Sequence, residues 1–275
     1  MTNTTLKTGQ PNYRCPLCKE PLSLNDKVYR CDNNHCFDQA KQGYVNLLPV
    51  QFKHSKEPGD NKAMVTARRA FLEKGFYQPL VNAMLKLYQQ YALASAVVFD
   101  AGCGEGFYTH QHKNDDNQVY GVDISKETVK IAAQKYKTCF FSVGTLSELP
   151  FQDEQFSWMF SVYAPILEQE FNRVLAKDGY LLTVTPGAEH LIALKSLIYQ
   201  QAKHHDESKQ VIQEMTLVKE EQLTYEMTFN NSEDVLNLLA MTPFAFKASK
   251  EVVEQLTKLT TFSCQADFIL RLYQK

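Results

Sequence analysis

The sequence has no apolar run near the roughly 20 residues that a membrane-spanning helix requires. It also lacks an excess of either charge, because 29 basic and 31 acidic residues leave a net charge of −2. Any surface that binds nucleic acid must therefore be local. The first ten residues are polar and lack the apolar centre of a secretory signal. We expect a cytoplasmic protein without a membrane segment.

The seven cysteines are unevenly distributed, and four of them lie between positions 15 and 36. A secreted disulfide scaffold would spread an even number of cysteines through a short chain, so this clustering favours a metal site. The spacing C-x2-C-x12-C-x3-H gives two close pairs joined by a hairpin, which suits tetrahedral zinc. The candidate ligands are Cys15, Cys18, Cys31 and His35. Cys36 is an alternative fourth ligand, because C-x4-C also forms a second pair.

Composition divides the chain into three regions, at residues 1–50, 51–90 and 91–275. The first holds the cysteine cluster and a short strand-like piece at 27–30. The second is a connector that begins with a polar turn around Pro58-Gly59-Asp60 and continues with helical spacing of apolar residues from Ala63 to Leu72. In the third, strand patterns alternate with helix patterns.

The alternation in the third region predicts an α/β fold with a Rossmann-like, mostly parallel sheet and helices on both faces. Strands are expected at 96–102, 118–125, 138–144, 156–163 and 180–186. Helices are expected at 126–136, with Ser125 as N-cap, and at 166–179, where Gly179 would stop the helix. Two later β-rich segments, 221–229 and 262–274, would close the sheet as an antiparallel pair.

A glycine-rich turn, Asp100-Ala-Gly102-Cys-Gly104-Glu105-Gly106, follows the first expected strand and leads into a helix at Phe107. Glycine lets a ligand approach the backbone more closely than a Cβ would permit. Asp123 ends the second strand, where an acid can accept hydrogen bonds from ribose hydroxyls. These features predict a nucleotide-like cofactor, although a nicotinamide or flavin cofactor could use the same geometry.

Two later segments resemble class I S-adenosylmethionine-dependent methyltransferases. They are Leu149-Pro-Phe151-Gln-Asp153-Glu-Gln-Phe156 and Glu170-Phe-Asn-Arg173-Val-Leu175-Ala-Lys-Asp-Gly179. With the glycine turn and Asp123, the resemblance spans residues 96–186 and implies S-adenosylmethionine as cofactor. The backbone from Gly102 to Gly106 would line its methionine end, and Asp123 would bind its ribose. Many relatives carry an acid where this chain has Gly144-Thr145, so we expect backbone groups to recognise the adenine here.

Further stretches resemble one family, the bacterial 23S rRNA guanine-N1 methyltransferase A. They are residues 38–50, 58–60, 67–72, 185–187, 190–191 and 241–244. This resemblance runs from Tyr13 to Leu272 and implies methylation of guanine N1 in the helix 35 hairpin of 23S rRNA. It also implies an RNA-reading zinc module and a homodimer whose cleft takes the hairpin. The zinc ligands would be Cys15, Cys18, Cys31 and His35, and the cofactor contacts would include Tyr77, Gly104, Glu105 and His190.

Basic residues gather in the connector, where they form a local patch suited to phosphate contacts or an ordinary solvated helix face. They are Lys53, His54, Lys56, Lys62, Arg68, Arg69 and Lys74. Tyr77, near the end of the connector, would either stack on the adenine or pack in the core.

Guanine N1 carries a proton at neutral pH, so a general base or a polarising contact at the target base is expected. The candidate bases are His190, Glu105 and Asp153. Ser161-Val-Tyr163-Ala-Pro165 lacks the Asn/Asp-Pro-Pro-aromatic motif of amino-methylating relatives, which favours a ring nitrogen as the target. Tyr163 is the candidate for stacking on an unstacked base. Tyr163 and His190 are the candidate catalytic residues.

Two other functions fit part of the sequence. A small-molecule methyltransferase would explain residues 96–186 but would leave the zinc module without a role. A nonenzymatic RNA-binding protein with a vestigial cofactor fold is disfavoured, because the glycine turn and Asp123 are intact.

Overall fold

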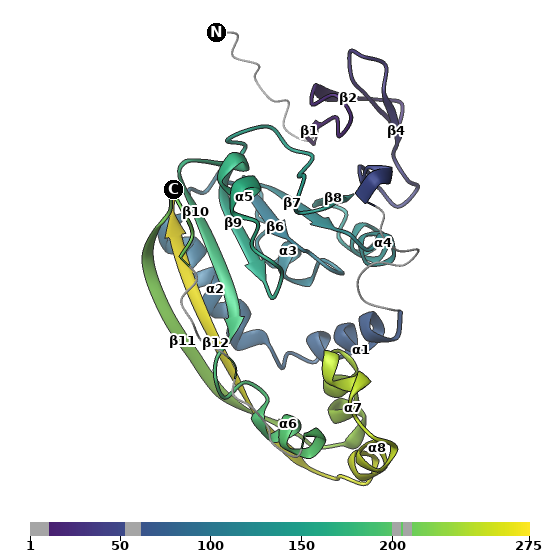
Figure 1. The fold of residues 1–275 in the computed structure, drawn as a ribbon, viewed down its shortest axis with the longest axis vertical. Helices are drawn as coiled ribbons and strands as arrows, with labels where there is room; N and C mark the ends of the chain where they lie inside the picture. Colours follow the sequence, from purple (N-terminus) through teal and green to yellow (C-terminus); the bar gives the residue numbers. More distant parts are fainter. Residues whose placement is uncertain (1–10, 53–61, 200–204, 206–210) are drawn as a thin grey trace.

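The computed structural model describes residues 11–52, 62–199, 205 and 211–275. The turn at 58–60 and the basic residues Lys53, His54 and Lys56 lie outside the described residues. The described part forms a small antiparallel sheet near the N-terminus and a larger mixed sheet (Figure 1). No helix in these described ranges combines the length and apolarity needed to cross a membrane.

The small sheet has four short strands in the order in which they occur in the chain. They are β1 (Tyr13–Arg14), β2 (Pro21–Asn25), β3 (Val28–Arg30) and β4 (Cys36–Asp38). A two-residue turn joins β2 to β3, and Asp26 and Lys27 both have positive φ there, as such hairpin turns require. The strand expected at 27–30 is confirmed as β3.

The large sheet has eight strands in the order β11-β12-β10-β9-β6-β7-β8-β5. Neighbours from β10 to β5 pair in parallel, whereas β12 is antiparallel to both β10 and β11. The strands are β5 (Val45–Asn46), β6 (Val97–Ala101), β7 (Gln118–Asp123), β8 (Phe140–Val143), β9 (Phe156–Val162), β10 (Leu175–Pro186), β11 (Thr216–Phe229) and β12 (Phe262–Gln274). The predicted mostly parallel sheet and its closing antiparallel pair are confirmed.

Central strands are mostly apolar, because helices and loops cover both of their faces. Val98, Phe99, Trp158, Met159 and Phe160 are all fully buried. The helices are α1 (Lys62–Glu73), α2 (Gln78–Tyr91), α3 (Phe107–Gln111), α4 (Lys126–Lys135), α5 (Glu168–Val174), α6 (Ile192–Ile198), α7 (Ser232–Ala240) and α8 (Lys250–Thr257). Short 3-10 helices, η1 (Val50–Phe52) and η2 (Pro243–Phe246), complete the fold. In Figure 1, α6, α7 and α8 gather at one end of the long β11–β12 pair, and α1 lies beside α7.

One predicted helix is too long. The helix expected at 166–179 ends at Val174, and β10 begins at the next residue, because the buried Leu175 already pairs with Phe156 of β9. The register then shifts between Leu175 and Tyr180, with Asp178 at positive φ. Gly179 therefore belongs to a bulge in the strand, and a Cβ there would lie 2.8 Å from the Ala176 carbonyl oxygen. In contrast, the N-cap expected at Ser125 is confirmed, since its side chain accepts a hydrogen bond from the Thr128 N–H.

The small sheet is seated directly on one face of the large one. Tyr13 stacks on Phe151 with ring centroids 5.7 Å apart and meets Tyr120 edge-on at 6.0 Å. Cys15 and Cys31 belong to the same buried apolar cluster as these rings. The region around the cysteines is therefore continuous with the core of the sheet domain.

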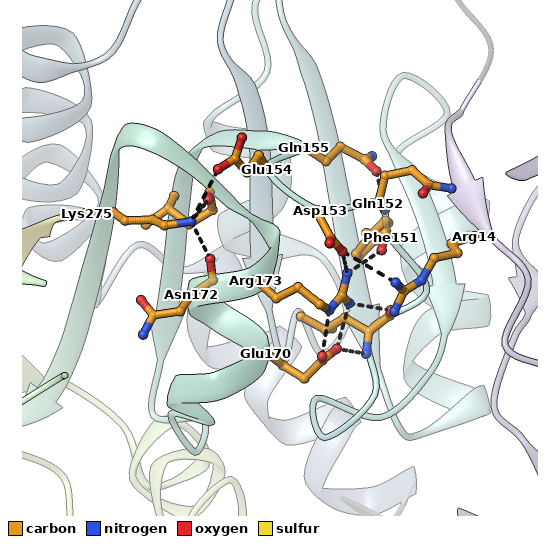
Figure 2. Close-up of polar contacts among 12 residues, drawn as sticks. Arg14, Phe151, Gln152, Asp153, Glu154, Gln155, Glu170, Asn172, Arg173 and Lys275 are labelled. Atoms are coloured by element: carbon orange, nitrogen blue, oxygen red, sulfur yellow. Dashed lines mark hydrogen bonds and ion pairs between the residues drawn. The ribbon is translucent and has the colours of Figure 1, made fainter. Parts of the chain in front are cut away.

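Arg173 on α5 joins the two sequence motifs that flank β9 (Figure 2). It forms a two-pronged ion pair with Glu170, with both N–O distances 2.7 Å, and it donates to the carbonyls of Leu149 and Phe151. Glu170 in turn accepts the Leu149 N–H at 2.6 Å. The Asp153 Oδ1 accepts hydrogen bonds from Nη1 of Arg173 at 2.8 Å and from Nη1 of Arg14 in β1 at 3.5 Å. The network ties the loop before β9 to both α5 and the small sheet.

We expect Arg173→Ala to lower the free energy of unfolding by about 2–4 kcal/mol, because it leaves a mostly buried carboxylate without its partner. Its side chain is 19% exposed and that of Glu170 is 16% exposed. Asp153→Asn is the control, because Asp153 is 68% exposed and its loss should cost less than about 1 kcal/mol. Urea titration of the zinc-loaded proteins measures both. Equal effects of the two variants would contradict the assignment.

Candidate cofactor site and metal centre

A cavity of about 830 Å³ opens at the carboxyl ends of the parallel strands, where open α/β sheets bind their ligands. Segments that follow β6, β7, β8, β9 and β10 line it, and residues of α1 and η2 close the opposite side. Seven predicted site residues line this cavity. They are Tyr77, Gly102, Gly104, Glu105, Asp123, Tyr163 and His190.

The glycine turn after β6 has left-handed backbone at three positions, with φ of 81° at Gly102, 53° at Gly104 and 84° at Gly106. A Cβ on Gly102 would lie 2.6 Å from the Cβ of Ala164, whereas a Cβ on Gly104 would meet no atom within 4 Å. Gly104 thus leaves open space beside the cavity for a ligand. Gly106 does not line the cavity, because it packs against Ala132, Tyr136 and Phe141. Glycine is required there by the left-handed backbone and by the close neighbours from the α4 and β8 region.

Asp123 fixes the shape of this turn. Its Oδ2 accepts the Gly104 N–H at 2.9 Å, and its Oδ1 accepts the Ser125 N–H at 2.8 Å and the Thr128 hydroxyl at 3.3 Å. Each carboxylate oxygen can accept more than one hydrogen bond, so Asp123 can hold the turn and still accept a ribose hydroxyl.

Two other carboxyl groups of the cavity have raised pKa values. Burial raises the pKa of Asp100 to about 7, and its Oδ2 accepts the Thr109 hydroxyl at 2.6 Å. Burial also raises the pKa of Glu105 to about 7, although Lys135, Arg69 and Arg68 oppose the rise. Glu105 is 4% exposed, and its Oε2 has no hydrogen-bond partner among the residues that the structure describes. A buried carboxylate oxygen that faces no protein donor suits a ligand that supplies one.

His190 is held as a neutral hydrogen-bond donor. The Asp267 N–H donates to its Nδ1 at 3.1 Å, so the proton of the neutral ring is on Nε2. Nε2 lies 3.1 Å from the Tyr163 hydroxyl and 3.4 Å from that of Tyr77. Burial, with His205 and Lys195 nearby, lowers the pKa of His190 to about 3. With one nitrogen accepting and the other protonated, His190 cannot act as a general base at neutral pH.

Asp267 of β12 positions His190, and the sequence patterns did not reveal it. Its carboxylate is fully buried and accepts hydrogen bonds from Gln222, Thr224 and the Glu189 N–H, at 2.9, 2.9 and 3.0 Å. Its carbonyl accepts the Gly187 N–H at 2.8 Å. The turn after β10 therefore has one defined conformation. The only signal in the sequence is an acidic residue among the apolar residues in the middle of the strand.

The two tyrosines that contact His190 differ in their exposure to solvent. Tyr163 directly follows β9 with φ of 61°, a strained value for a non-glycine residue, and is 46% exposed. Tyr77 is 4% exposed and packs edge-on against Phe71 and Phe268, with ring centroids 4.9 and 5.0 Å away. Tyr77 thus packs in the core with its hydroxyl directed to His190, and it also lines the cavity. Tyr163 presents an accessible ring.

The remaining predicted residues lie apart from the cavity or in ion pairs. Asp153, a candidate base, does not line the cavity and pairs with Arg173. Of the basic patch, Arg69 pairs with Glu73 at 3.0 Å and Lys74 pairs with Asp234. Lys62 is exposed, whereas Arg68 lines the cavity. Fewer basic side chains of the described connector are therefore available for phosphate contacts than its sequence predicted.

The loop after β8 contributes Gly144, Thr145, Leu146 and Ser147 to the cavity. The Thr145 and Ser147 hydroxyls lie 2.8 Å apart. No acidic side chain occupies this stretch, so backbone and hydroxyl groups are what it offers to a ligand.

The predicted zinc ligands converge in the small sheet. The ligand atoms of Cys15, Cys18, Cys31 and His35 all lie within 4.8 Å of one another. His35 Nδ1 is 3.6 Å from Cys15 Sγ and 3.5 Å from Cys31 Sγ, and Cys18 Sγ is 3.6 Å from Cys31 Sγ. Zinc bonds of about 2.3 Å to sulfur and 2.0–2.1 Å to nitrogen give such separations in a tetrahedron. Cys36 is exposed, and its Sγ approaches the Asn34 carbonyl instead.

Comparison with known proteins finds two family matches. The N-terminal zinc ribbon of RlmA matches residues 13–56, and a methyltransferase domain matches residues 93–234. The 23S rRNA (guanine(748)-N(1))-methyltransferase of Streptomyces fradiae is 36% identical over 66% of this chain and 65% of its own.

Two candidate 23S rRNA (guanine-N(1)-)-methyltransferases are also similar. One, from Micromonospora griseorubida, is 35% identical over 67% of this chain and 68% of its own. The other, from Bacillus subtilis, is 28% identical over 93% of this chain and 94% of its own.

We expect one zinc ion per chain, which Cys31→Ser and His35→Ala should release, because each removes one of four ligands. Cys36→Ser is the matched control and should retain the metal. Elemental analysis of freshly purified protein measures the zinc. A Cys36→Ser protein that loses zinc while His35→Ala keeps it would reverse the assignment. The metal-free variants should retain affinity for S-adenosylmethionine and lose methylation of RNA, because the cluster lies outside the cavity.

Proposed function

The chain belongs to the RlmA family of S-adenosylmethionine-dependent methyltransferases, and we propose that it methylates N1 of a guanine in 23S ribosomal RNA. The observation that carries this proposal is the presence of two sites on one packed core. A cofactor cavity lies at the carboxyl ends of the sheet, and a Cys3His cluster is packed on the same sheet. A small-molecule methyltransferase would have no use for the second site. The three similar proteins are named for guanine N1 of 23S rRNA.

The residues of the cavity fit S-adenosylmethionine from one end to the other. The open backbone at Gly104 and the unpartnered Glu105 Oε2 suit the methionine end. Asp123 would accept the ribose hydroxyls, and the loop at 144–147 would recognise the adenine. Tyr77 and His190 also line the cavity, between the part assigned to the cofactor and its apolar side. When bound, the cofactor supplies an electrophilic methyl group on sulfonium sulfur.

The other half of the cavity suits a flipped-out base. Tyr163 offers an accessible aromatic face, and Pro165 and Phe244 add apolar surface. Because transfer from a sulfonium is an in-line displacement, holding the base at the right angle supplies much of the catalysis. Tyr163, fixed by its unusual backbone and by His190, is suited to that task.

The same geometry favours a polarising contact over a general base. His190 donates Nε2–H to the Tyr163 oxygen, so the Tyr163 hydroxyl proton can be directed toward a substrate acceptor. We propose that the Tyr163 hydroxyl donates a hydrogen bond to guanine O6 and keeps its proton, which stabilises the negative charge that develops on the base as N1 loses its proton to solvent. Of the three candidate bases, neither His190 nor Asp153 has the geometry of a base here, and Glu105 is assigned to the methionine end of the cofactor.

Two finer assignments rest on the family resemblance of the sequence. We propose that the target lies in the helix 35 hairpin, and that a homodimer provides the cleft that takes it. The enzyme would then act in the cytoplasm, on ribosomal RNA or its precursors. The domain limits at residues 50 and 90 are proposed from composition, although β5 at 45–46 already pairs with the large sheet.

Ribosomal RNA treated with the enzyme should contain 1-methylguanosine in helix 35. Undermodified 23S rRNA and S-adenosylmethionine are the reactants, and nucleoside mass spectrometry with fragment mapping identifies the product. Recovery of 2-methylguanosine, 7-methylguanosine or a methylated adenosine or cytidine would disprove the assignment. Cofactor binding without any transfer to RNA would support the nonenzymatic or small-molecule alternatives instead.

Tyr163→Phe keeps the aromatic ring but removes the hydroxyl, so kcat should fall by about 100-fold, the effect of removing one donor to a developing oxyanion. Affinity for S-adenosylmethionine should stay unchanged. In the native enzyme, the rate of the methyl-transfer step should rise steadily with pH between about 6.5 and 8.5, because N1 titrates above this range and His190 stays neutral. Single-turnover kinetics measures the rate of methyl transfer in the variant and its pH dependence in the native enzyme. A plateau above pH 7 would indicate a general base with a pKa near neutrality instead.

A further inference from the structure

Lys195 of α6 is a buried cation beside the cavity. It is 4% exposed, and its Nζ has no hydrogen-bond partner among the residues that the structure describes. An ammonium group loses its hydration when it is buried, so this position without a partner is costly. A lysine ordinarily avoids that cost, because its long side chain lets the charged end reach water. The burial therefore indicates that the charge serves the neighbouring site.

Phe244 connects this charge to the cavity. The Lys195 Nζ lies 5.8 Å from the centroid of the Phe244 ring, within the range of a cation–π interaction. Phe244 lines the cavity, whereas Lys195 does not. Tyr199, the residue that follows α6, packs against the same ring with centroids 6.1 Å apart and the two planes perpendicular. The ring is therefore held from the side of α6, with a positive charge against it.

Four titratable groups act on Lys195 or are affected by its charge. Burial lowers the pKa of Lys195, whereas Glu189 and Cys264 favour its charged form. Burial also lowers the pKa of His190 and that of His205, and the charge of Lys195 adds to both effects. Because both imidazoles line the cavity, the positive field of Lys195 reaches into it.

The chemistry proposed for the cavity gives this field a use. The target guanine becomes negatively charged as N1 loses its proton, and a nearby positive charge favours the ionised form. Phe244 belongs to the half of the cavity suited to the base. A phosphate of the RNA is a poor partner for Lys195, because the Nζ is buried and does not line the cavity.

We propose that Lys195 acts through Phe244: it holds the ring on which the target guanine stacks and places a positive charge behind that ring, which favours the N1-deprotonated base. Lys195 does not touch the substrate and keeps its own proton, so it is a positioning residue, and the N1 proton goes to solvent. This inference rests on the proposed methylation of guanine N1. The hydroxyl of Tyr163 and the charge of Lys195 would then stabilise the same anion from different sides.

Lys195→Met keeps a long unbranched side chain but removes the charge. Methyl transfer at neutral pH should slow by about 10-fold, the effect of a unit charge one aromatic ring away at an effective dielectric constant of about 20. The deficit should shrink as the pH rises toward about 10, because guanine N1 then ionises without help and Lys195 loses its own charge. Single-turnover kinetics at saturating RNA measures the rate of the native and variant enzymes across this range.

The same variant should be at least as stable as the native protein, because it removes an unpaired buried charge. Calorimetry of the zinc-loaded proteins compares their melting temperatures, and isothermal titration should find unchanged affinity for S-adenosylmethionine. Lys195→Gln, which is also uncharged, replaces the methionine variant if that one folds poorly by circular dichroism.

Lys250→Met is the matched control. It removes an exposed lysine from α8, at the same end of the fold, and Lys250 does not line the cavity (Figure 1). Its rate at saturating RNA should match that of the native enzyme at every pH.

Two outcomes would overturn the proposal. If Lys195→Met slows transfer by the same factor at every pH, Lys195 only packs against Phe244. If the rate is unchanged while the KM for RNA rises, Lys195 contacts the RNA backbone. A native enzyme that transfers no methyl group to guanine N1 would refute the proposed function itself, and this role with it.

Discussion

The turn between β6 and α3 is held by the strand beside it, and the rest of the site is built on that attachment. The Asp123 carboxylate accepts the Gly104 N–H, and the Val122 carbonyl accepts the N–H groups of Gly102 and Cys103 at 3.0 and 2.9 Å. Because the turn is fixed, Ala164 can pack against Gly102 at a distance that no other residue would allow. The backbone after β9 must bend sharply there, and Tyr163 takes the strained conformation that follows.

The position of Tyr163 in turn depends on residues that lie across the cavity. The Tyr163 hydroxyl meets His190, whose orientation depends on the Asp267 N–H and on the turn that the Asp267 carboxylate holds. Each contact specifies the next, so Tyr163 and His190 are held in place by the protein itself. Such preorganisation is what a displacement reaction needs, since there is little for the protein to do beyond alignment and charge stabilisation.

Much of this structure could be predicted from the sequence, where the signal is local. A few neighbouring residues suffice to recognise the C-x2-C and C-x3-H pairs, the Ser125 cap and the apolar strands. The end of α5 could not be predicted in this way, because Leu175 leaves the helix to pair with a strand distant in the sequence. Tertiary pairing overrides local helical propensity there.

The missed features depend on contacts between distant segments. Asp267 matters only because β12 lies between β10 and β11, which brings it beside the turn after β10. Gly106 belongs to the glycine-rich turn, but its own neighbours are the side chains of Ala132, Tyr136 and Phe141, from α4, its C-cap and β8. Arg68 and Arg69 are adjacent and chemically alike, yet one lines the cavity and the other pairs on the surface. Composition cannot separate them, since only the packing of α1 against α7 decides which face is inside.

Burial gives the cavity a further property. It raises the pKa of Glu105 to about 7, because an ionised carboxylate without a partner is poorly solvated there. A bound ammonium would supply the missing partner and favour the ionised form. Below pH 7, where Glu105 is protonated in the free protein, cofactor binding must then release a proton, and affinity should increase as the pH rises toward 7. His190, with its pKa near 3, contributes nothing to this dependence. Burial thus makes the charge of Glu105 depend on pH near neutrality, whereas it keeps His190 neutral.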